Sequence, residues 1–200
     1  PYLTGSLLGL SNIFGTLLVL GIPMGMYSKF LVQERETSER LLHNIMPKQI
    51  AEILKNSSEP VALENPDISV MMADIVNFTS FSDNVSAEKV VKLLNDIFSR
   101  FDEVVLEYSV EKIKTIGDAY MVVAGLPEAR ADHAQILVDM SAKFIEIASE
   151  YNDHEGKPIQ IRIGIHSGPA VSGVIGKSKF AFDVWGDTIN TAARLEGNGE

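Results

Sequence analysis

The sequence predicts an α+β fold in which a mixed or antiparallel sheet carries helices on one face. Ile68–Ala73 (ISVMMA) is a short, continuously apolar run, as in a buried central strand. Ala87–Leu106 repeats apolar side chains at helical spacing. Two short β-rich runs, Val110–Thr115 and Ala119–Ala124, then meet at a Gly-Asp turn, which is typical of a hairpin. A strand, a helix and a hairpin in this order favour a sheet with helices packed against it.

The N-terminal segment is predicted to be a transmembrane helix over residues 1–30, the last of a larger membrane domain. Residues 1–28 contain no charged side chain, and Lys29 is the first. A helix of roughly 20 apolar residues is long enough to cross the hydrocarbon core of a bilayer. The alternative is a hydrophobic helix buried in a soluble fold.

Residues 31–60 are predicted to form a helical transducer segment and a linker. An apolar stripe at Leu41, Leu42, Ile45 and Met46 lies on an otherwise charged helix. A second copy of the same helix, in a parallel coiled coil, is its expected partner; packing against the chain's own globular domain is the alternative. Pro47 ends this helix and starts a short one that runs to about Lys55. Asn56–Pro66 is expected to be a linker.

Residues 61–200 are predicted to form the catalytic domain. Its long helix is expected to bury Val90, Val91, Leu94, Ile97, Phe98, Phe101, Val104 and Val105. The remaining elements are expected to be a helix at Ala131–Tyr151, a strand at Ile159–Ile165 that ends at a turn containing His166, a hairpin from Ala170–Ile175 and Phe180–Val184, and a helix at Asp187–Leu195.

Composition excludes some classes of function. The chain has no cysteine, so disulfide and thiol chemistry are absent. The formal net charge of −10 argues against a nucleic-acid-binding surface, which needs basic patches. A small polyanion such as a nucleoside triphosphate remains compatible with this charge if cations receive it locally.

Two aspartates are candidates for metal chemistry. Asp74 ends the apolar strand and is followed by a turn into polar, helix-capping residues. Asp118 lies in the tight turn of the hairpin. Carboxylates on neighbouring strands can hold two divalent ions, one to activate a hydroxyl group and one to neutralise leaving phosphates. Each aspartate alone also has an ordinary explanation, as a helix cap or a turn residue.

Three strings resemble the signatures of the class III adenylate and guanylate cyclases. They are MMADIVNFTSFS at 71–82, EKIKTIGDAYMVVAGLP at 111–127 and FDVWGDTINTAARLE at 182–196. The resemblance extends from about Leu41 to Glu200 and is closest in pattern to the mycobacterial membrane-bound adenylate cyclases, which look like halves of the mammalian membrane enzymes. It implies a class III catalytic domain of the ferredoxin-like, palm-like type.

The resemblance also implies a role for each site residue and a homodimer that shares two sites. In such a dimer one chain supplies the metals and the other the purine-reading, ribose-orienting and phosphate-stabilising groups. The implied cofactors are two divalent cations, Mg²⁺ or Mn²⁺. The expected partners are ATP, a second copy of the chain and the membrane, which the N-terminal helix would enter. The implied site residues are Asp74, Asp118 and the carbonyl of Ile75 for metal, Asn77, Phe78 and Thr79 for phosphate, Lys114 and Asp183 for the purine, and Asn190 and Arg194 for catalysis.

The purine pair favours ATP. Adenine offers an acceptor at N1 and a donor at N6, which a lysine and a carboxylate complement, whereas guanine reverses this pattern. Because the guanylate members carry an acidic residue in place of Lys114, the sequence predicts an adenylate cyclase that forms cyclic AMP and pyrophosphate. A catalytically silent dimeric signalling module and a guanylate cyclase are the alternatives. The GG-[DE]-[DE]-F signature of diguanylate cyclases is absent.

Two expectations concern the whole protein. Relatives continue past the position of Glu200 with a basic residue that meets the terminal phosphates, so we expect the catalytic domain to be C-terminally incomplete in this sequence. We also expect a location at the cell membrane, with the catalytic domain in the cytoplasm.

Overall fold

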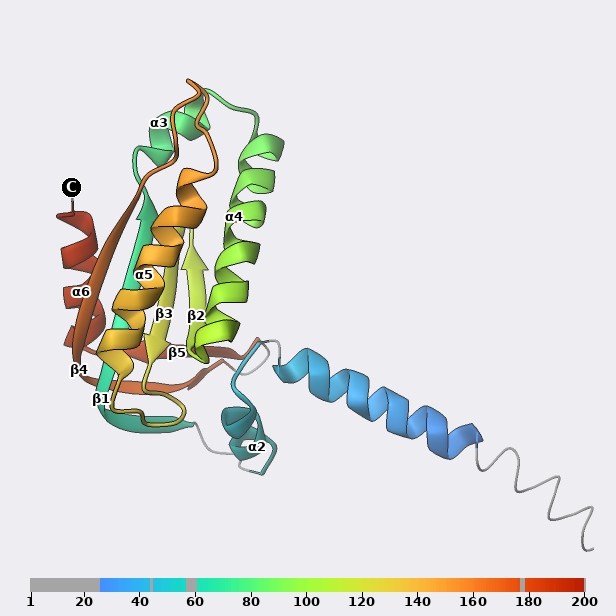
Figure 1. Cartoon of the computed structure of the whole chain (residues 1–200). Helices are drawn as coiled ribbons and strands as arrows, with labels where there is room; N and C mark the ends of the chain where they lie inside the picture. Colours follow the sequence, from blue (N-terminus) through green and yellow to red (C-terminus); the bar gives the residue numbers. More distant parts are fainter. Residues whose placement is uncertain (1–25, 44, 57–60, 177–178, 200) are drawn as a thin grey trace, which may run out of the picture. The chain divides into compact units, whose positions relative to one another are not determined.

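A computed structural model describes residues 26–43, 45–56, 61–176 and 179–199 (Figure 1). The chain divides into two compact units, Pro1–Ile45 and Met46–Glu200. The described part of the first unit contains a helix over residues 26–43. Within the described ranges no helix is both long and apolar enough to cross a membrane. The predicted membrane helix at 1–30 falls mainly on residues 1–25, outside those ranges.

The second unit contains a five-stranded sheet in which all pairings are antiparallel, in the order β2-β3-β1-β4-β5. The antiparallel alternative of the predicted fold class is therefore confirmed. The strands are β1 (Ala62–Ile75), β2 (Glu111–Ile116), β3 (Ala119–Ala124), β4 (Ile161–Ile175) and β5 (Ala181–Trp185), and the helices are α2 (Lys48–Asn56), α3 (Phe78–Asp83), α4 (Ala87–Tyr108), α5 (His133–Ser149) and α6 (Asp187–Gly197).

Strand β1 is the central strand, as its apolar run predicts. It lies between β3 and β4, and residues 68–73 are all buried. The strand is longer than predicted because it begins at Ala62, so the expected linker at Asn56–Pro66 is wrong from Ala62 onward. Pro66 is tolerated because the pairing with β4 shifts register between Asn65 and Ile68, and irregular points of this kind do not need a ladder hydrogen bond.

Strand β4 is one continuous strand, and the predicted turn containing His166 is wrong. His166 pairs with Val70, and Gly168 pairs with Ile68. The length of β1 explains the difference, since it gives β4 a hydrogen-bonding partner through the Ser-Gly positions that would otherwise favour a turn. The far end of β4 pairs with β5 as the predicted hairpin.

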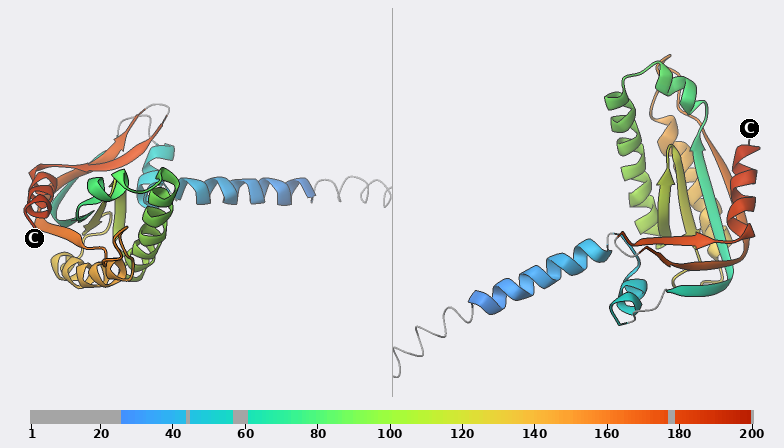
Figure 2. Two further views of the ribbon diagram at one scale, coloured as in Figure 1. Left: turned by 90° about the horizontal axis from the view of Figure 1, so that it is seen from above. Right: turned by 180° about the vertical axis from the view of Figure 1, so that it is seen from behind.

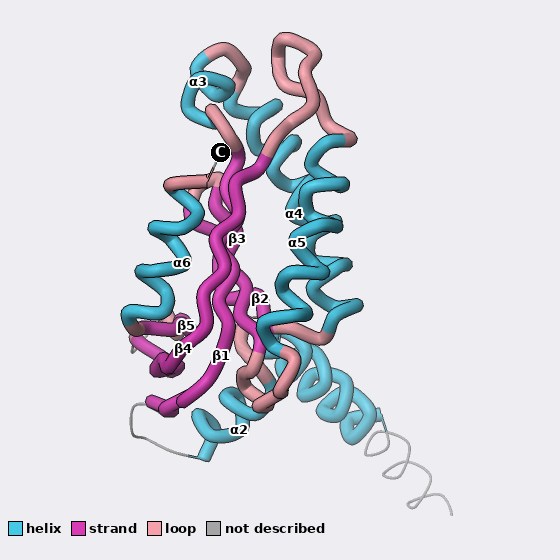
Figure 3. The backbone as a smooth tube through the Cα atoms, turned by 60° about the vertical axis from the view of Figure 1, so that its left-hand side comes forward, coloured by secondary structure: helices cyan, strands magenta, loops and turns pink. Residues whose placement is uncertain are grey.

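Helices cover both faces of the sheet, which corrects the expectation of helices on one face only. Helices α4 and α5 lie on one face and α6 lies on the other (Figures 2 and 3). Between α4, α5 and the sheet, Phe101 stacks on Phe144 with ring centroids 3.8 Å apart. On the other face α6 approaches β4 closely at Gly164, where an added Cβ would lie 2.2 Å from the carbonyl oxygen of Ala192.

The buried face of α4 follows the helical period, with one correction. Ile97, Phe101, Val104 and Val105 are buried, whereas Val91 is 66% exposed. Val90 lies near the middle of this buried stripe, whereas Val91, about 100° further round the helix, lies at its edge. The prediction that both are buried is therefore wrong for Val91.

Helix α2 packs within the second unit. Ile50 and Ala51 are buried, as is Met46 just before the helix. Gln49 on α2 donates a hydrogen bond to the Glu128 carboxylate in the loop after β3, at 3.0 Å. Leu41 and Ile45, from the predicted coiled-coil stripe, are among the exposed apolar side chains, and their pairing with a second chain stays a prediction.

Candidate active site

Asp74 and Asp118 meet at one end of the sheet. Asp74 is the penultimate residue of β1, and Asp118 lies in the turn between β2 and β3. The register pairs Ala73 with Tyr120, which brings that turn beside the end of β1. Gly117 adopts a φ of +63° in the turn, a conformation that glycine tolerates without strain.

The two carboxylates influence each other. Burial, a hydrogen bond with Asp74 and the charge of that carboxylate together raise the pKa of Asp118 to about 6. Amide hydrogen bonds from Asp118 itself and from Ile75 act in the opposite direction. Paired oxygen ligands that carry excess negative charge are suited to a hard divalent cation.

Arg162 also reaches this site, which sequence reasoning missed. Its Nη2 atom lies 2.8 Å from Oδ2 of Asp74, and its Nε atom lies 3.2 Å from Oε1 of Glu196 on α6. Arg162 stands opposite Asp74 in the β1–β4 pairing. In the alternating strand IQIRIGI it looks like an exposed residue, and only the packing of α6 on this face reveals otherwise.

The predicted phosphate-binding residues lie at the start of α3. Asn77 precedes the helix with a φ of 58°, and Phe78 packs against the core beneath it. The amide groups of the first helical turn have no partner within a helix, so they are available to an anion. This loop follows directly from Asp74 and Ile75, so the structure places the predicted metal and phosphate residues together.

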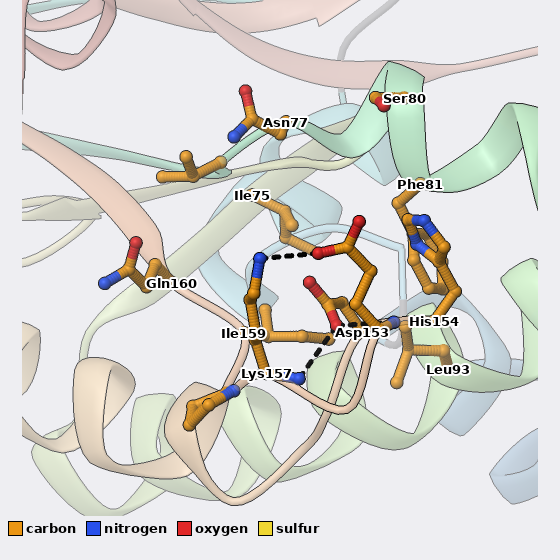
Figure 4. A pocket seen from close by; sticks show the side chains of 13 residues that line it. Ile75, Asn77, Ser80, Phe81, Leu93, Asp153, His154, Lys157, Ile159 and Gln160 are labelled. Atoms are coloured by element: carbon orange, nitrogen blue, oxygen red, sulfur yellow. Dashed lines mark hydrogen bonds and ion pairs between the residues drawn. The ribbon is translucent and has the colours of Figure 1, made fainter.

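A cavity of about 680 Å³ lies next to this loop, between α3 and residues 153–160 (Figure 4). Ile75 and Asn77 line it, together with an ion pair between Lys157 and Glu155 at 2.5 Å. Neither Asp74 nor Asp118 lines the cavity. This cavity is therefore adjacent to the aspartates and does not contain them.

The predicted purine pair is formed within one chain. Nζ of Lys114 lies 2.5 Å from Oδ2 of Asp183, with side chains that are 38% and 19% exposed. The pair joins β2 and β5, the two edge strands of the sheet. Oδ1 of Asp183 also accepts the backbone N–H of Val184 at 2.9 Å, which fixes the orientation of the carboxylate.

Asn190 and Arg194 point away from the aspartates of their own chain. Thr188 and Ala192 are the buried residues of α6, and Glu196 on the same side reaches Arg162. Asn190 and Arg194, four residues apart, are on the opposite side and exposed, with 71% of the Arg194 side chain accessible. One chain therefore does not bring this pair to its own Asp74 and Asp118.

The sequence of residues 61–200 matches the family model of the adenylate and guanylate cyclase catalytic domain. The chain belongs to this cyclase family. An adenylate cyclase of Mycobacterium tuberculosis is 42% identical over 164 residues, which are 82% of this chain and 37% of that protein. The receptor-type guanylate cyclase gcy-5 of Caenorhabditis elegans is 39% identical over 178 residues, 86% of this chain and 16% of that protein.

A solved cyclase structure shares the fold. The catalytic core of a rhodopsin-guanylyl cyclase with converted specificity, in complex with ATPαS, superposes with a TM-score of 0.66 and 38% sequence identity. The match covers 72% of this chain and 77% of that one. The sequence-based recognition of a class III cyclase catalytic domain is confirmed. Because adenylate and guanylate cyclases are similarly close, the comparisons leave the purine open.

Proposed function

We propose that this protein is an adenylate cyclase, which converts ATP into 3′,5′-cyclic AMP and pyrophosphate. The observation that carries the proposal is the ion pair of Lys114 with Asp183. A lysine donor and a carboxylate acceptor complement adenine N1 and N6. Guanine would place its N1–H donor against the lysine and its O6 acceptor against the carboxylate. Each mismatch costs about 1–3 kcal/mol when the groups are desolvated.

The residues at the end of β1 fit a site for two divalent cations, Mg²⁺ or Mn²⁺. Asp74, Asp118 and the Ile75 carbonyl offer hard oxygen ligands, and Asp74 and Asp118 are already in contact. Among the described residues no group of three or more His, Cys, Asp or Glu side chains is arranged to hold a metal. Such a partial ligand set suits Mg²⁺, which usually completes its shell with water and substrate phosphates. When bound, the cations would activate the ribose 3′-hydroxyl and neutralise charge on the leaving pyrophosphate.

The remaining groups would position the triphosphate and stabilise its charge. Amides at Asn77, Phe78 and Thr79 would receive phosphate oxygens at the start of α3. Arg162 adds a forked guanidinium beside the carboxylates, a donor geometry suited to phosphate. The reaction needs no covalent enzyme intermediate, so positioning and charge neutralisation would account for most of the rate.

The complete site would form between two chains. Because Asn190 and Arg194 face away from the aspartates of their own chain, they would complete the active site formed around Asp74 and Asp118 of a second copy. Asn190 would orient the ribose and Arg194 would meet the charge that develops on phosphate. Exchange of this kind in a twofold dimer produces two equivalent sites. We further propose that the uncharged segment before Lys29 anchors the dimer in the cell membrane, with the catalytic domains in the cytoplasm.

Replacing Lys114 with glutamate is expected to abolish the preference for ATP over GTP. The new carboxylate would accept from guanine N1–H and would repel adenine N1, so the ratio of ATP to GTP turnover should fall at least about a hundredfold. Product formation from each nucleotide at saturating Mn²⁺ measures this ratio. Lys112→Glu is the matched control, since Lys112 is on the same strand and pairs with Asp102 instead. A ratio that is unchanged in Lys114→Glu would show that this pair does not read the base.

A further inference from the structure

Arg162 is shared by two carboxylates from different elements. One end of its guanidinium meets Asp74 at 2.8 Å, and its Nε atom faces Glu196 at 3.2 Å. The Nε atom and Oε1 of Glu196 are both cut off from solvent, and neither has a hydrogen-bond partner. At 3.2 Å the positive charge of Arg162 and the negative charge of Glu196 still stabilise each other. A buried charge with no opposite charge nearby would be costly.

Close packing of the α6 backbone against β4 restricts the position of Glu196. At Gly164 an added Cβ would lie 2.2 Å from the backbone nitrogen of Glu196, so a glycine is required for α6 to approach β4. Only 14% of the Glu196 side chain is exposed. Glu196 therefore reaches Arg162 from a rigidly packed helix end, whereas Asp74 reaches it from the strand that is proposed to hold metal.

A cation bound by Asp74 would compete with Arg162 for the same carboxylate. Oδ2 of Asp74 cannot give full charge to a metal and to a guanidinium together. Among the described residues Asp74 and Glu196 are the carboxylates that form ion pairs with Arg162, so without Glu196 the displaced arginine would have lost both. With Glu196 in place, its Nε end stays held while its other nitrogen atoms turn toward bound phosphate.

We infer that Glu196 is a positioning residue, which retains Arg162 at the active site when Asp74 binds a divalent cation and presents it to the triphosphate. The inference rests on the proposed metal role of Asp74. Glu196 is then needed both for Arg162 to release Asp74 readily and for Arg162 to contact the nucleotide. A role for Glu196 through charge alone predicts something different, since removing a negative charge would then tighten the binding of a polyanion.

The test uses binding measurements in place of turnover. Electron paramagnetic resonance gives the affinity of the nucleotide-free protein for Mn²⁺, and calorimetry gives its affinity for 3′-deoxy-ATP, which cannot cyclise. Glu196→Gln should weaken both affinities about three- to tenfold, the usual range for coupled neighbours. Arg162→Gln should tighten Mn²⁺ binding because the competitor is gone. Adding Glu196→Gln to Arg162→Gln should cause no further loss of 3′-deoxy-ATP affinity.

Two controls separate the possible failures. Glu107→Gln breaks an ion pair with Lys143 elsewhere on the domain and should change neither affinity. Asp74→Asn should abolish Mn²⁺ binding; if it does not, the proposed metal site is wrong and the inference falls with it. If Asp74→Asn does abolish binding, unchanged or tighter 3′-deoxy-ATP binding by a folded Glu196→Gln protein overturns the inference alone. Unchanged melting temperatures establish that the variants are folded.

Discussion

Cyclic AMP formation is expected to fall at least about a thousandfold when Asp74 is replaced by asparagine, because metal stabilisation of the transition state amounts to several kcal/mol. Asparagine has the same shape but lacks the charge that would hold the cation. Arg162 would keep Glu196 as its partner, so the fold should persist. Initial rates with ATP and saturating Mn²⁺, together with the melting temperature, measure the two effects.

The matched control is Asp139→Asn, which removes an exposed carboxylate on α5 that accepts a hydrogen bond from Gln135. We expect it to retain wild-type turnover. Turnover by Asp74→Asn at the wild-type rate would contradict the metal mechanism. A loss of the folded transition in that variant would instead show that Asp74 supports the structure.

Two inactive variants are expected to restore activity when their chains are mixed. Asp74→Asn removes the proposed metal ligand, and Arg194→Ala removes the proposed phosphate-stabilising group, which faces away from Asp74. In a mixed dimer, one site would combine both defects and the other would contain neither. Random exchange should therefore recover about a quarter of wild-type activity, since about half of the dimers are mixed and each has one intact site of two.

The control for this experiment is a mixture of Asp74→Asn with Asp118→Asn. Both substitutions affect the proposed metal ligands of the same chain, so each site of the mixed dimer keeps one defect and activity should stay low. Recovery in this control, or no recovery with Arg194→Ala under conditions in which chains exchange, would argue against a site composed from two chains.

Much of the fold follows from local pattern. The apolar run at Ile68–Ala73 and the hairpin around Gly117 were predictable because each is defined by neighbouring residues. The continuity of β4 through His166 was not, since Ser-Gly favours a turn until a long partner strand supplies hydrogen bonds. The position of α6 depends likewise on close approach at Gly164, which the sequence pattern does not reveal.

The same distinction applies to the site. Asp74 and Asp118 could be predicted to meet because a hairpin turn and a strand end are recognisable in the sequence. Arg162 and Glu196 were missed, because their contact depends on strand register and on which face α6 covers. A charged residue in an alternating strand is ordinarily solvated, so no signal at Arg162 alone distinguishes it. The outward direction of Asn190 and Arg194 follows from helical spacing once Ala192 is known to be buried.

Product formation from ATP and from GTP, each with excess Mn²⁺ and over a range of protein concentrations, tests the central claim most directly. We expect cyclic AMP from ATP, little cyclic GMP from GTP, and a specific activity that rises with protein concentration as dimers form. The preference for ATP would support purine recognition by the Lys114–Asp183 pair. The dependence on protein concentration would support an active site composed from two chains. Preferential formation of cyclic GMP, or a folded, dimeric protein that makes neither product, would contradict the account.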